Sequence, residues 1–519
     1  MSNAPDPLSR REGRSPLRAI GLFLVLYFVT RTLSLNALPI FLDEAVHLQW
    51  AERLYSEGRV LRPVGSGRLL AVAAYGLALP FEDRLWAARL IASLAGAVTL
   101  AVTMLLAHRL FGSLASAVAG ALYLFSPFAL VYDRLALSDG LLSACIASLM
   151  LATWTLARRP DDTAPRGWAA ALMAFAVFSK VSALLFFLTV PLGVLALARE
   201  RLRALRSAAI ACAIGFLFAS PMLWFFAWNS GEIASQHVAD PALAGSTLLA
   251  TLLDMRGWAL SYFTPPALLA AAVSIALLRD GRALWLAGSV ALPFVLFAFF
   301  SQPWSARYVL PTLPPLLLLI AGGIDAGVSR LKPSLRAVAA MGLTLLVLVS
   351  SLSFDRDLVL DPSQAPFPED DRRQLVTGWP AGYGVRELAA RLEQEALTGE
   401  LTAYVDTGGT RTFPTSLAVL VGRRPSVRLV EGDFGSGNVR ASMAEEAKTR
   451  RVFAIVGPRT SDLDFKSAIA DAALAERVEV YERPGGEWAA TLFRLRGPAG
   501  AEASSGAGGG IVLGSPTPR

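Results

Sequence analysis

The chain has 519 residues, of which 54% are hydrophobic and only 17% are charged, and its mean hydropathy is +0.49. Soluble chains carry about 25% charged residues, so these values exclude an ordinary soluble protein and place most of the chain in lipid. The formal net charge is +7. The arginines stand between apolar segments rather than on one polar face, which argues against a nucleic-acid partner.

The first 18 residues are polar and basic, and we expect them to form a cytoplasmic tail. Apolar sequence begins at Ala19 without a clear small-residue cleavage site, so it is predicted to be a retained anchor rather than a signal peptide. Segments of about 17 to 25 apolar residues can cross a bilayer. About eleven such segments follow, approximately at 19–37, 85–107, 113–131, 140–157, 167–179, 181–198, 207–228, 257–278, 283–300, 308–325 and 335–353.

Basic residues fix the expected orientation of these spans. They cluster at the N-terminus, at 158–166, at 199–206, at 279–282 and at 330–336. With eleven spans, every cluster falls on the side of the N-terminus, which the positive-inside rule assigns to the cytoplasm. The loop that contains Asp43 and the sequence after the last span are then extracytoplasmic.

The sequence after the last span has a soluble composition. Strand patterns at 402–405, 427–430, 451–456, 478–481 and 488–495, with helical periodicity at 384–395 and 442–450, predict an α/β or α+β extracytoplasmic domain. We therefore expect a cytoplasmic tail at 1–18, a transmembrane domain at 19–353, a soluble domain at 354–497 and a disordered tail at 498–519.

Two adjacent carboxylates, Asp43 and Glu44, stand where the first apolar segment ends, before a predicted amphipathic helix at 46–57. Such a pair can deprotonate a hydroxyl, orient it or hold a divalent cation. Acidic residues also favour a solvated helix N-terminus, and the pair alone does not decide between these alternatives.

Further polar residues lie at the predicted outer ends of other spans. Tyr132 and Arg134 follow the third span and Asp139 begins the fourth, so Arg134 could grip a phosphate or form an ion pair with Asp139. Lys180 interrupts an apolar run, and it either marks a hairpin tip or meets an anion. Arg307 precedes Tyr308 at another outer helix end, where snorkelling is the alternative.

No single one of these positions is decisive, but the topology gathers them at one face. Basic and acidic groups at an outer lipid boundary suit a lipid-linked phosphate whose leaving group stays in the membrane. His47 lies three residues beyond Glu44, and with His237 it gives a weak candidate metal site. A divalent metal therefore stays an alternative, and no other cofactor is indicated.

Seven short motifs follow one another along the chain: Phe41-Leu42-Asp43-Glu44-Ala45, Gln49-Trp50-Ala51, Ala88-Arg89-Leu90, Ser126-Pro127, Tyr132-x-Arg134 with Asp139, Phe178-Ser179-Lys180 and Arg307-Tyr308-Val309-Leu310-Pro311. As a set, in this order, they resemble the polyprenyl-phosphate-sugar glycosyltransferases of the GT-C superfamily. The set is similar in particular to the dolichyl-phosphate-mannose protein mannosyltransferases and their bacterial relatives, including the lipid A aminoarabinose transferases.

The resemblance implies an inverting sugar transfer from a polyprenyl phosphate donor on the periplasmic face of the inner membrane. It implies that Asp43 is the general base and that Glu44 orients acceptor or donor. Arg134, Lys180 and Arg307, with the neighbouring Tyr132 and Tyr308, would contact the donor phosphate, and Asp139 would order the site. The acceptor is a glycan, a lipid or a protein.

Two other classes of function stay open at this stage. A carrier or flippase for a lipid-linked anion also needs basic residues and many spans, although transporters usually place their polar site near the midplane of the bilayer. A non-catalytic scaffold for envelope assembly would use only the outer domain.

Overall fold

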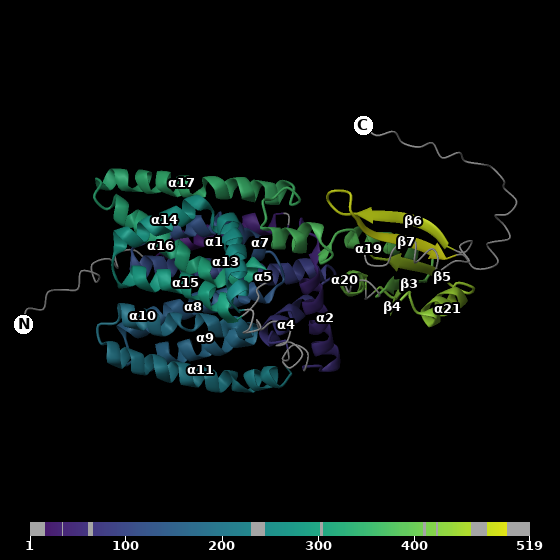
Figure 1. Cartoon of the computed structure of the whole chain (residues 1–519), viewed down its shortest axis with the longest axis horizontal. Coiled ribbons are helices and arrows are strands. Elements are labelled where there is room, and N and C mark those ends of the chain that lie inside the picture. The colour runs from purple at the N-terminus through teal and green to yellow at the C-terminus, as the bar shows by residue number, and fades with distance from the viewer. Residues whose placement is uncertain are drawn as a thin grey trace, which may run out of the picture. The chain divides into compact units, whose positions relative to one another are not determined.

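The computed structural model describes residues 16–33, 35–60, 66–229, 244–300, 305–407, 412–421, 424–457 and 475–495 (Figure 1). They form two compact units. The first, called here the helical unit, comprises Met1–Leu38 and Val46–Arg372. The second, called the sheet unit, comprises Arg373–Arg519 together with the short segment Pro39–Ala45.

Helices make up the described part of the helical unit (Figure 1). The helix α2 begins in the Pro39–Ala45 segment and continues into this unit. The bounds are α1 Leu17–Thr32, α2 Leu42–Glu57, α4 Leu69–Tyr75, η2 Gly76–Ala78, α5 Arg84–Leu110, α6 Ser113–Leu124, α7 Pro127–Tyr132, α8 Ser138–Arg158, α9 Thr163–Ser179, η3 Val181–Phe186, α10 Thr189–Leu197, α11 Arg201–Asn229, α13 Ala244–Trp258, η5 Ala259–Phe263, α14 Pro265–Leu278, α15 Gly281–Phe300, η6 Ala306–Thr312, α16 Leu313–Val328, α17 Pro333–Leu360 and α18 Glu369–Arg372.

The predicted polytopic helical class is confirmed. Within the described residues, six helices are long and apolar enough to cross a membrane, and a bent pair, Thr251–Phe263 with Pro265–Leu278, adds a seventh. Each of the eleven predicted segments coincides with helix, but several fall on shorter pieces such as α1, α6 and α10. The number of spans therefore stays a prediction.

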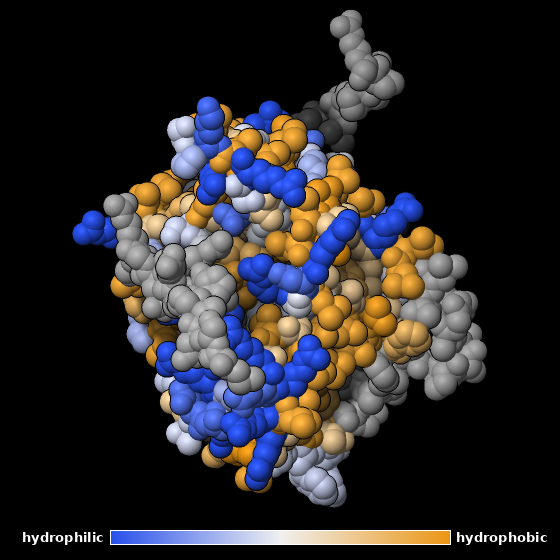
Figure 2. Space-filling view, turned by 90° about the vertical axis from the view of Figure 1, so that its left-hand side faces the viewer, coloured by the Kyte–Doolittle hydropathy of each residue, from blue (hydrophilic) through white to orange (hydrophobic). Residues whose placement is uncertain are grey.

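Burial separates central helices from peripheral ones. The apolar window of the segment Ala306–Val328 is 89% buried, whereas that of α11 is 22% buried and that of α17 is 33% buried. Helix α5 packs against α1, α6, α8 and α16. The outer helices therefore present apolar side chains outward, as a lipid-facing surface requires, and broad hydrophobic areas are visible in Figure 2.

Local sequence explains where several helices begin. The side chain of Asp83 accepts a hydrogen bond of 2.8 Å from the backbone N–H of Trp86 and so caps α5. Proline stands at the start of α7, α14 and α17, where its missing N–H removes no helical hydrogen bond.

The basic clusters fall in the turns between helices. Arg158 ends α8 and Arg159 follows it, Arg199 precedes α11, Arg279 follows α14, and Lys332 precedes α17. The turns α10–α11 and α16–α17 are at the same end of the helical unit in Figure 1. Hydrophilic residues gather on that end in Figure 2, as expected for one polar membrane face.

The sheet unit is an α/β domain, which is one of the two predicted alternatives. Its five-stranded sheet has the order β4-β3-β5-β7-β6, with β3 parallel to β4 and β5, and β7 antiparallel to β5 and β6. The bounds are β3 Leu401–Asp406, β4 Val427–Gly432, β5 Arg451–Val456, β6 Ala475–Glu482 and β7 Trp488–Leu495; the helices are α19 Val385–Ala396, α20 Thr412–Val421 and α21 Gly437–Glu446, and the π-helix η7 spans Arg373–Thr377.

A second, two-stranded sheet joins β1 (Ile40–Phe41) to β2 (Ala381–Gly382). The sequence pattern predicts all five strands of the large sheet, and β5 and β7 have the predicted bounds. The helix predicted at 442–450 begins earlier, at Gly437, and the pattern predicts neither α20 nor the β1–β2 pair. The predicted disordered tail at 498–519 lies outside the described residues.

Candidate active site

Lys180 and Asp139 form a buried ion pair in the helical unit. Lys180 follows the last residue of α9 and Asp139 lies in the first turn of α8. The Lys180 Nζ atom donates to Asp139 Oδ1 over 2.6 Å, and the two side chains are 8% and 3% exposed. Asp139 is therefore the partner of Lys180 rather than of Arg134, which the sequence offers as the alternative. The pairing allows a lysine to stay buried beside apolar helices.

Two cations lie near the ring of Tyr308. The Lys180 Nζ atom is 3.8 Å from the centroid of the Tyr308 ring, and the Arg307 Cζ atom is 5.7 Å from the same centroid. Both distances are within the range of cation–π attraction. The structure thus brings together four of the predicted site residues, Asp139, Lys180, Arg307 and Tyr308, from three separate parts of the chain.

Tyr132, another predicted site residue, lies in a buried network around Asp371. Its hydroxyl donates to Asp371 Oδ2 and is 3.3 Å from Ser305 Oγ. Ser305 Oγ donates to Asp371 Oδ1 over 2.7 Å, and Tyr262 donates to Asp371 Oδ2 over 2.7 Å. The carboxylate therefore receives three hydroxyl groups, which satisfies a buried acceptor.

Sequence reasoning misses Asp371, Ser305 and Tyr262. Asp371 ends the acidic run Glu369-Asp370-Asp371, a pattern that is typical of a solvated surface, yet its side chain is buried. Ser305 stands just before the Arg307-Tyr308 motif, and this closeness is the available signal. Tyr262 lies in the π-helical segment η5, a local irregularity that often accompanies functional sites.

Burial raises the pKa of Asp371 above the ordinary value of an aspartate, because desolvation disfavours the charged form. Hydrogen bonds from Ser305, Tyr132 and Tyr262, with the positive charge of Arg307, act in the opposite direction and are outweighed. The carboxyl group is therefore surrounded mainly by neutral hydroxyl donors. They stabilise its charged form, but they compensate for the loss of water less fully than a paired cation would.

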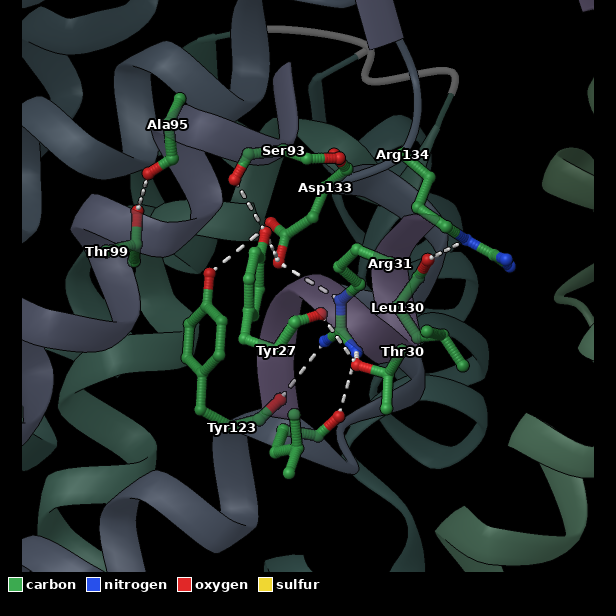
Figure 3. Close-up of polar contacts among 11 residues, drawn as sticks. Tyr27, Thr30, Arg31, Ser93, Ala95, Thr99, Tyr123, Leu130, Asp133 and Arg134 are labelled. Atoms are coloured by element: carbon green, nitrogen blue, oxygen red, sulfur yellow. Dashed lines mark hydrogen bonds and ion pairs between the residues drawn. The ribbon is translucent and has the colours of Figure 1, made fainter. Parts of the chain in front are cut away.

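A second buried cluster surrounds Asp133, the residue between Tyr132 and Arg134 (Figure 3). Arg31 Nε is 3.7 Å from Asp133 Oδ2, and the Tyr27 hydroxyl donates to the same oxygen over 3.0 Å. The Tyr123 hydroxyl donates to Asp133 Oδ1 over 3.3 Å. This cluster ties α1 to α6 and to the segment after α7, and it fixes the backbone on which Tyr132 and Arg134 stand.

The Arg134 side chain points away from the Asp133 cluster (Figure 3). Its Nε atom donates to the carbonyl oxygen of Leu130 over 2.9 Å. The residue is 2% exposed, and its two terminal nitrogens are buried without a hydrogen-bond partner in the described part of the chain. An unsatisfied buried guanidinium is costly, and a planar fork of donors of this kind suits a phosphate or carboxylate.

Asp43 and Glu44 lie in the first turn of α2 and belong to the sheet unit. Glu44 is fully buried, and its Oε2 atom accepts a hydrogen bond of 3.0 Å from the backbone N–H of Phe41. That contact is the side-chain-to-backbone half of a capping box. Glu44 thus caps the start of α2, whereas Asp43 is partly exposed.

His47 contacts two groups of the helical unit. Its Nδ1 atom is 2.9 Å from the carbonyl oxygen of Ala136, and its Nε2 atom is 3.2 Å from Arg68 Nη1. Because arginine only donates, Nε2 is the acceptor and Nδ1 carries the proton. His237, the other candidate metal ligand, lies outside the described residues. Among the residues that the structure describes, no group of three His, Cys, Asp or Glu side chains is placed to hold a metal ion.

The apolar helical body with its buried basic residues, together with the α/β unit, is that of a multi-pass membrane protein with a soluble domain. Comparison with known proteins adds a family resemblance. Residues 70–225 match the family model described as dolichyl-phosphate-mannose-protein mannosyltransferase. No curated protein matches the sequence.

Two solved structures share the fold. One is ArnT from Cupriavidus metallidurans bound to undecaprenyl phosphate, with a TM-score of 0.57 and 17% identity, covering 93% of this chain and 99% of that chain. The other is ArnT from the same organism in the apo state, with a TM-score of 0.55 and 18% identity, covering 93% of this chain and 99% of that chain. The family match and the shared fold confirm the predicted resemblance to the GT-C glycosyltransferases.

Proposed function

We propose that this protein transfers a sugar from a polyprenyl phosphate to an acceptor on the extracytoplasmic face of the inner membrane. The observation that carries the proposal is the buried guanidinium of Arg134, whose two terminal nitrogens lack a partner within the described residues. A phosphate supplies the acceptor oxygens that this fork needs. The structure that shares this fold with bound undecaprenyl phosphate supports the same ligand chemistry.

On the donor side, Arg134 binds the phosphate through the two terminal nitrogens of its fork, and Lys180 and Arg307 add positive charge beside the ring of Tyr308. Asp139 holds Lys180 in place. Tyr132 is the remaining residue proposed for the donor side, and its hydroxyl contacts Ser305. As the bond between the sugar and the phosphate breaks, negative charge grows on the leaving phosphate, and fixed cations stabilise that charge in the transition state.

On the acceptor side, Asp43 is the general base. It takes the proton of the acceptor hydroxyl or amine while that atom attacks the anomeric carbon. A bond forms from the acceptor to the anomeric carbon, the carbon–phosphate-oxygen bond breaks on the opposite face, and polyprenyl phosphate leaves with the electron pair. The configuration of the sugar inverts. Glu44 supports this step by holding the first turn of α2.

The proposal includes the topology. We place the basic turns at the cytoplasmic side and the site, with residues 354–497, at the periplasmic side. The partners are then a polyprenyl-phosphate sugar, the bilayer and a glycan, lipid or protein acceptor.

The test is donor turnover by purified protein in nanodiscs, using a panel of radiolabelled polyprenyl phosphate sugars with membrane extract as the acceptor source. Wild type is expected to consume one donor and to release polyprenyl phosphate. The variant Asp43→Asn keeps the shape of the side chain and removes the base. If wild type consumes no donor, or if both proteins work equally, the proposed mechanism is wrong and the carrier and scaffold alternatives take precedence.

A further inference from the structure

We propose that the sheet unit takes part in catalysis by positioning the segment that carries Asp43. It does so through the two-stranded sheet of β1 and β2, called here the β1–β2 ribbon, and Gly382 is the positioning residue. The claim about catalysis rests on the proposed function, in which Asp43 is the general base. The claim that the β1–β2 ribbon forms rests on the backbone geometry alone, so experiments can reject one claim and leave the other.

The segment before Asp43 is held by main-chain pairing. Ile40 is opposite Gly382 and Phe41 is opposite Ala381 in antiparallel register. The next residue, Leu42, donates its backbone N–H to the carbonyl oxygen of Pro380 over 3.1 Å. Three consecutive residues are thus fixed by the segment 380–382, and Asp43 follows at once.

Two further features hold the segment that carries Asp43 in place relative to β2. The bond from the Phe41 N–H to Glu44 Oε2 closes the first turn of α2 around Asp43. Ile40 and Phe41 are 3% and 4% exposed, and α20 packs against both β1 and β2. The Asp43 backbone is therefore anchored on both sides, with the apolar anchor supplied by the sheet unit.

Gly382 allows the close approach of the two strands. A Cβ atom at this position would lie 2.4 Å from the carbonyl oxygen of Ile40 and 2.7 Å from Ile40 Cγ2. The first of these neighbours is backbone, which cannot move aside as a flexible side chain can. Any larger residue at 382 must therefore push β1, and with it the start of α2, away from β2.

The sheet unit supplies none of the basic groups assigned to the donor, and the inferred positioning of Asp43 is its part in the proposed reaction. The donor cations Arg134, Lys180 and Arg307 all belong to the helical unit, whereas Asp43 belongs to the sheet unit. Because a general base acts only within hydrogen-bond reach of the proton it removes, a displacement of about 1 Å is expected to slow turnover by about 100-fold.

The first experiment compares Gly382→Ala with Gly437→Ala in the full-length protein. Gly437 lies in the same unit, and a Cβ there would meet nothing within 4 Å. Gly382→Ala is expected to lower kcat by about 100-fold while the KM for the donor and the affinity for polyprenyl phosphate stay at wild-type values. Gly437→Ala is expected to behave as wild type. Equal kcat in both variants and wild type would overturn the inference.

The second experiment tests the ribbon without depending on enzymatic activity. Cysteines are placed at the paired positions by Phe41→Cys and Ala381→Cys, in a background where the free Cys145 and Cys212 are alanine. Cα atoms of directly opposed antiparallel residues lie about 4.5 to 5.5 Å apart, within disulfide range. Oxidation is expected to cross-link the pair in nearly all molecules, and either single-cysteine variant is the control.

Turnover of the double-cysteine protein then links the ribbon to catalysis. The oxidised form is expected to work as fast as the same protein after reduction, because the ribbon is intact throughout the reaction. Failure to cross-link, or a large gain of turnover on reduction, would contradict the inference. Absence of transfer in wild type, with efficient cross-linking, would instead reject the proposed function and leave the ribbon standing.

Discussion

The two regions proposed to share the chemistry are positioned in different ways. In the helical unit, several site residues are held by side chains: Lys180 by Asp139, Lys180 and Arg307 by the ring of Tyr308, and Tyr132 by Asp371 and Ser305. In the sheet unit, Asp43 is held by backbone pairing and by a helix cap. Charge placement in the first region depends on burial and pairing, whereas in the second it depends on main-chain register.

This difference has a chemical reason. Lys180 is buried in a low-dielectric helical body and must stay charged to bind a phosphate, which requires a partner, here Asp139, that compensates for lost solvation. A general base acts only within hydrogen-bond reach of the proton that it removes, so its position must be fixed. Anchoring the backbone on either side of Asp43 fixes its position, and Glu44 makes the capping contact of α2.

The sharpest way to separate the two adjacent carboxylates is to change each to its amide. Asp43→Asn is expected to lower kcat by about 10² to 10⁴-fold, the usual contribution of a general base. Glu44→Gln is expected to keep most of the activity, because glutamine also serves in a capping box. The measurement is the initial rate of radiolabelled sugar transfer. Equal losses in the two variants would show that Glu44 takes part in the chemistry.

Breaking the ion pair of the helical unit is expected to cost stability as well as rate. Lys180→Met leaves the carboxylate of Asp139 buried without its partner, which typically costs about 3 to 5 kcal/mol. The double variant Asp139→Asn/Lys180→Met removes both charges and is expected to recover much of the stability but not the donor affinity. Unfolding in detergent gives the first quantity and polyprenyl phosphate binding the second. Additive losses in the double variant would contradict a direct pairing.

Asp371→Asn tests the network around Tyr132. Asparagine offers one acceptor oxygen where the carboxylate receives hydroxyl groups on two, so we expect a loss of roughly 1 to 3 kcal/mol from the unsatisfied donor. Chemical unfolding in detergent measures this loss. The structural role of the network is contradicted if the variant is as stable as wild type at every pH.

The sign of the pH effect follows from the raised pKa of Asp371. A native state with a raised carboxyl pKa binds the proton more tightly than the unfolded chain does. This contribution to stability is fully present below the ordinary aspartate range and is lost as pH rises through the native pKa. Wild type is therefore expected to lose stability relative to Asp371→Asn as pH rises, and an opposite trend would contradict the assignment of burial as the dominant cause.

The smallest expected loss of stability is that of a variant in the sheet unit, Glu446→Gln. Glu446 accepts hydrogen bonds from Thr402 and Tyr404 over 2.7 and 2.9 Å and pairs with Arg428 at 3.3 Å. Burial acts to raise the pKa of Glu446, but these hydrogen bonds and the positive charge outweigh it and lower that pKa. Glu446→Gln is expected to destabilise β3 and β4 by about 1 kcal/mol at neutral pH.

The pH dependence of that variant has the opposite sign to the one at Asp371. Stability from a lowered carboxyl pKa is present above the ordinary glutamate value, about 4.3, and is lost as pH falls through the lower native pKa. Amide hydrogen exchange in β3 and β4 is expected to show a difference between wild type and Glu446→Gln that shrinks on acidification. A difference independent of pH would point to lost packing alone.

Much of the helical unit could be predicted because its physical signals are local. Each predicted apolar segment coincides with helix, and the lysine that interrupts an apolar run, Lys180, does meet an anionic group. The partner of Asp139 could not be predicted. Arg134 is near Asp139 in sequence, whereas Lys180 reaches it only through the tertiary packing of α8 against α9.

The β1–β2 ribbon and the hydrogen-bond network around Asp371 could not be predicted from the sequence, for a different reason. Two-residue strands such as β1 and β2 have no periodicity, and their pairing joins Ile40 to Gly382 across most of the chain. Asp371 is buried while Glu369 in the same acidic run is exposed, and only tertiary packing distinguishes them. In the sheet unit, by contrast, the apolar runs Arg451–Val456 and Trp488–Leu495 form β5 and β7 with the predicted bounds.

The most direct test of a division between donor binding and proton removal measures both on the same samples of wild type, Asp43→Asn and Arg134→Gln. Binding of a fluorescent polyprenyl phosphate gives donor affinity, and transfer of a labelled sugar gives turnover. The account predicts that Asp43→Asn binds as wild type does and does not turn over, and that Arg134→Gln loses affinity by about tenfold or more, as expected for a charge-assisted contact. Unchanged affinity in Arg134→Gln, or normal turnover in Asp43→Asn, would contradict it.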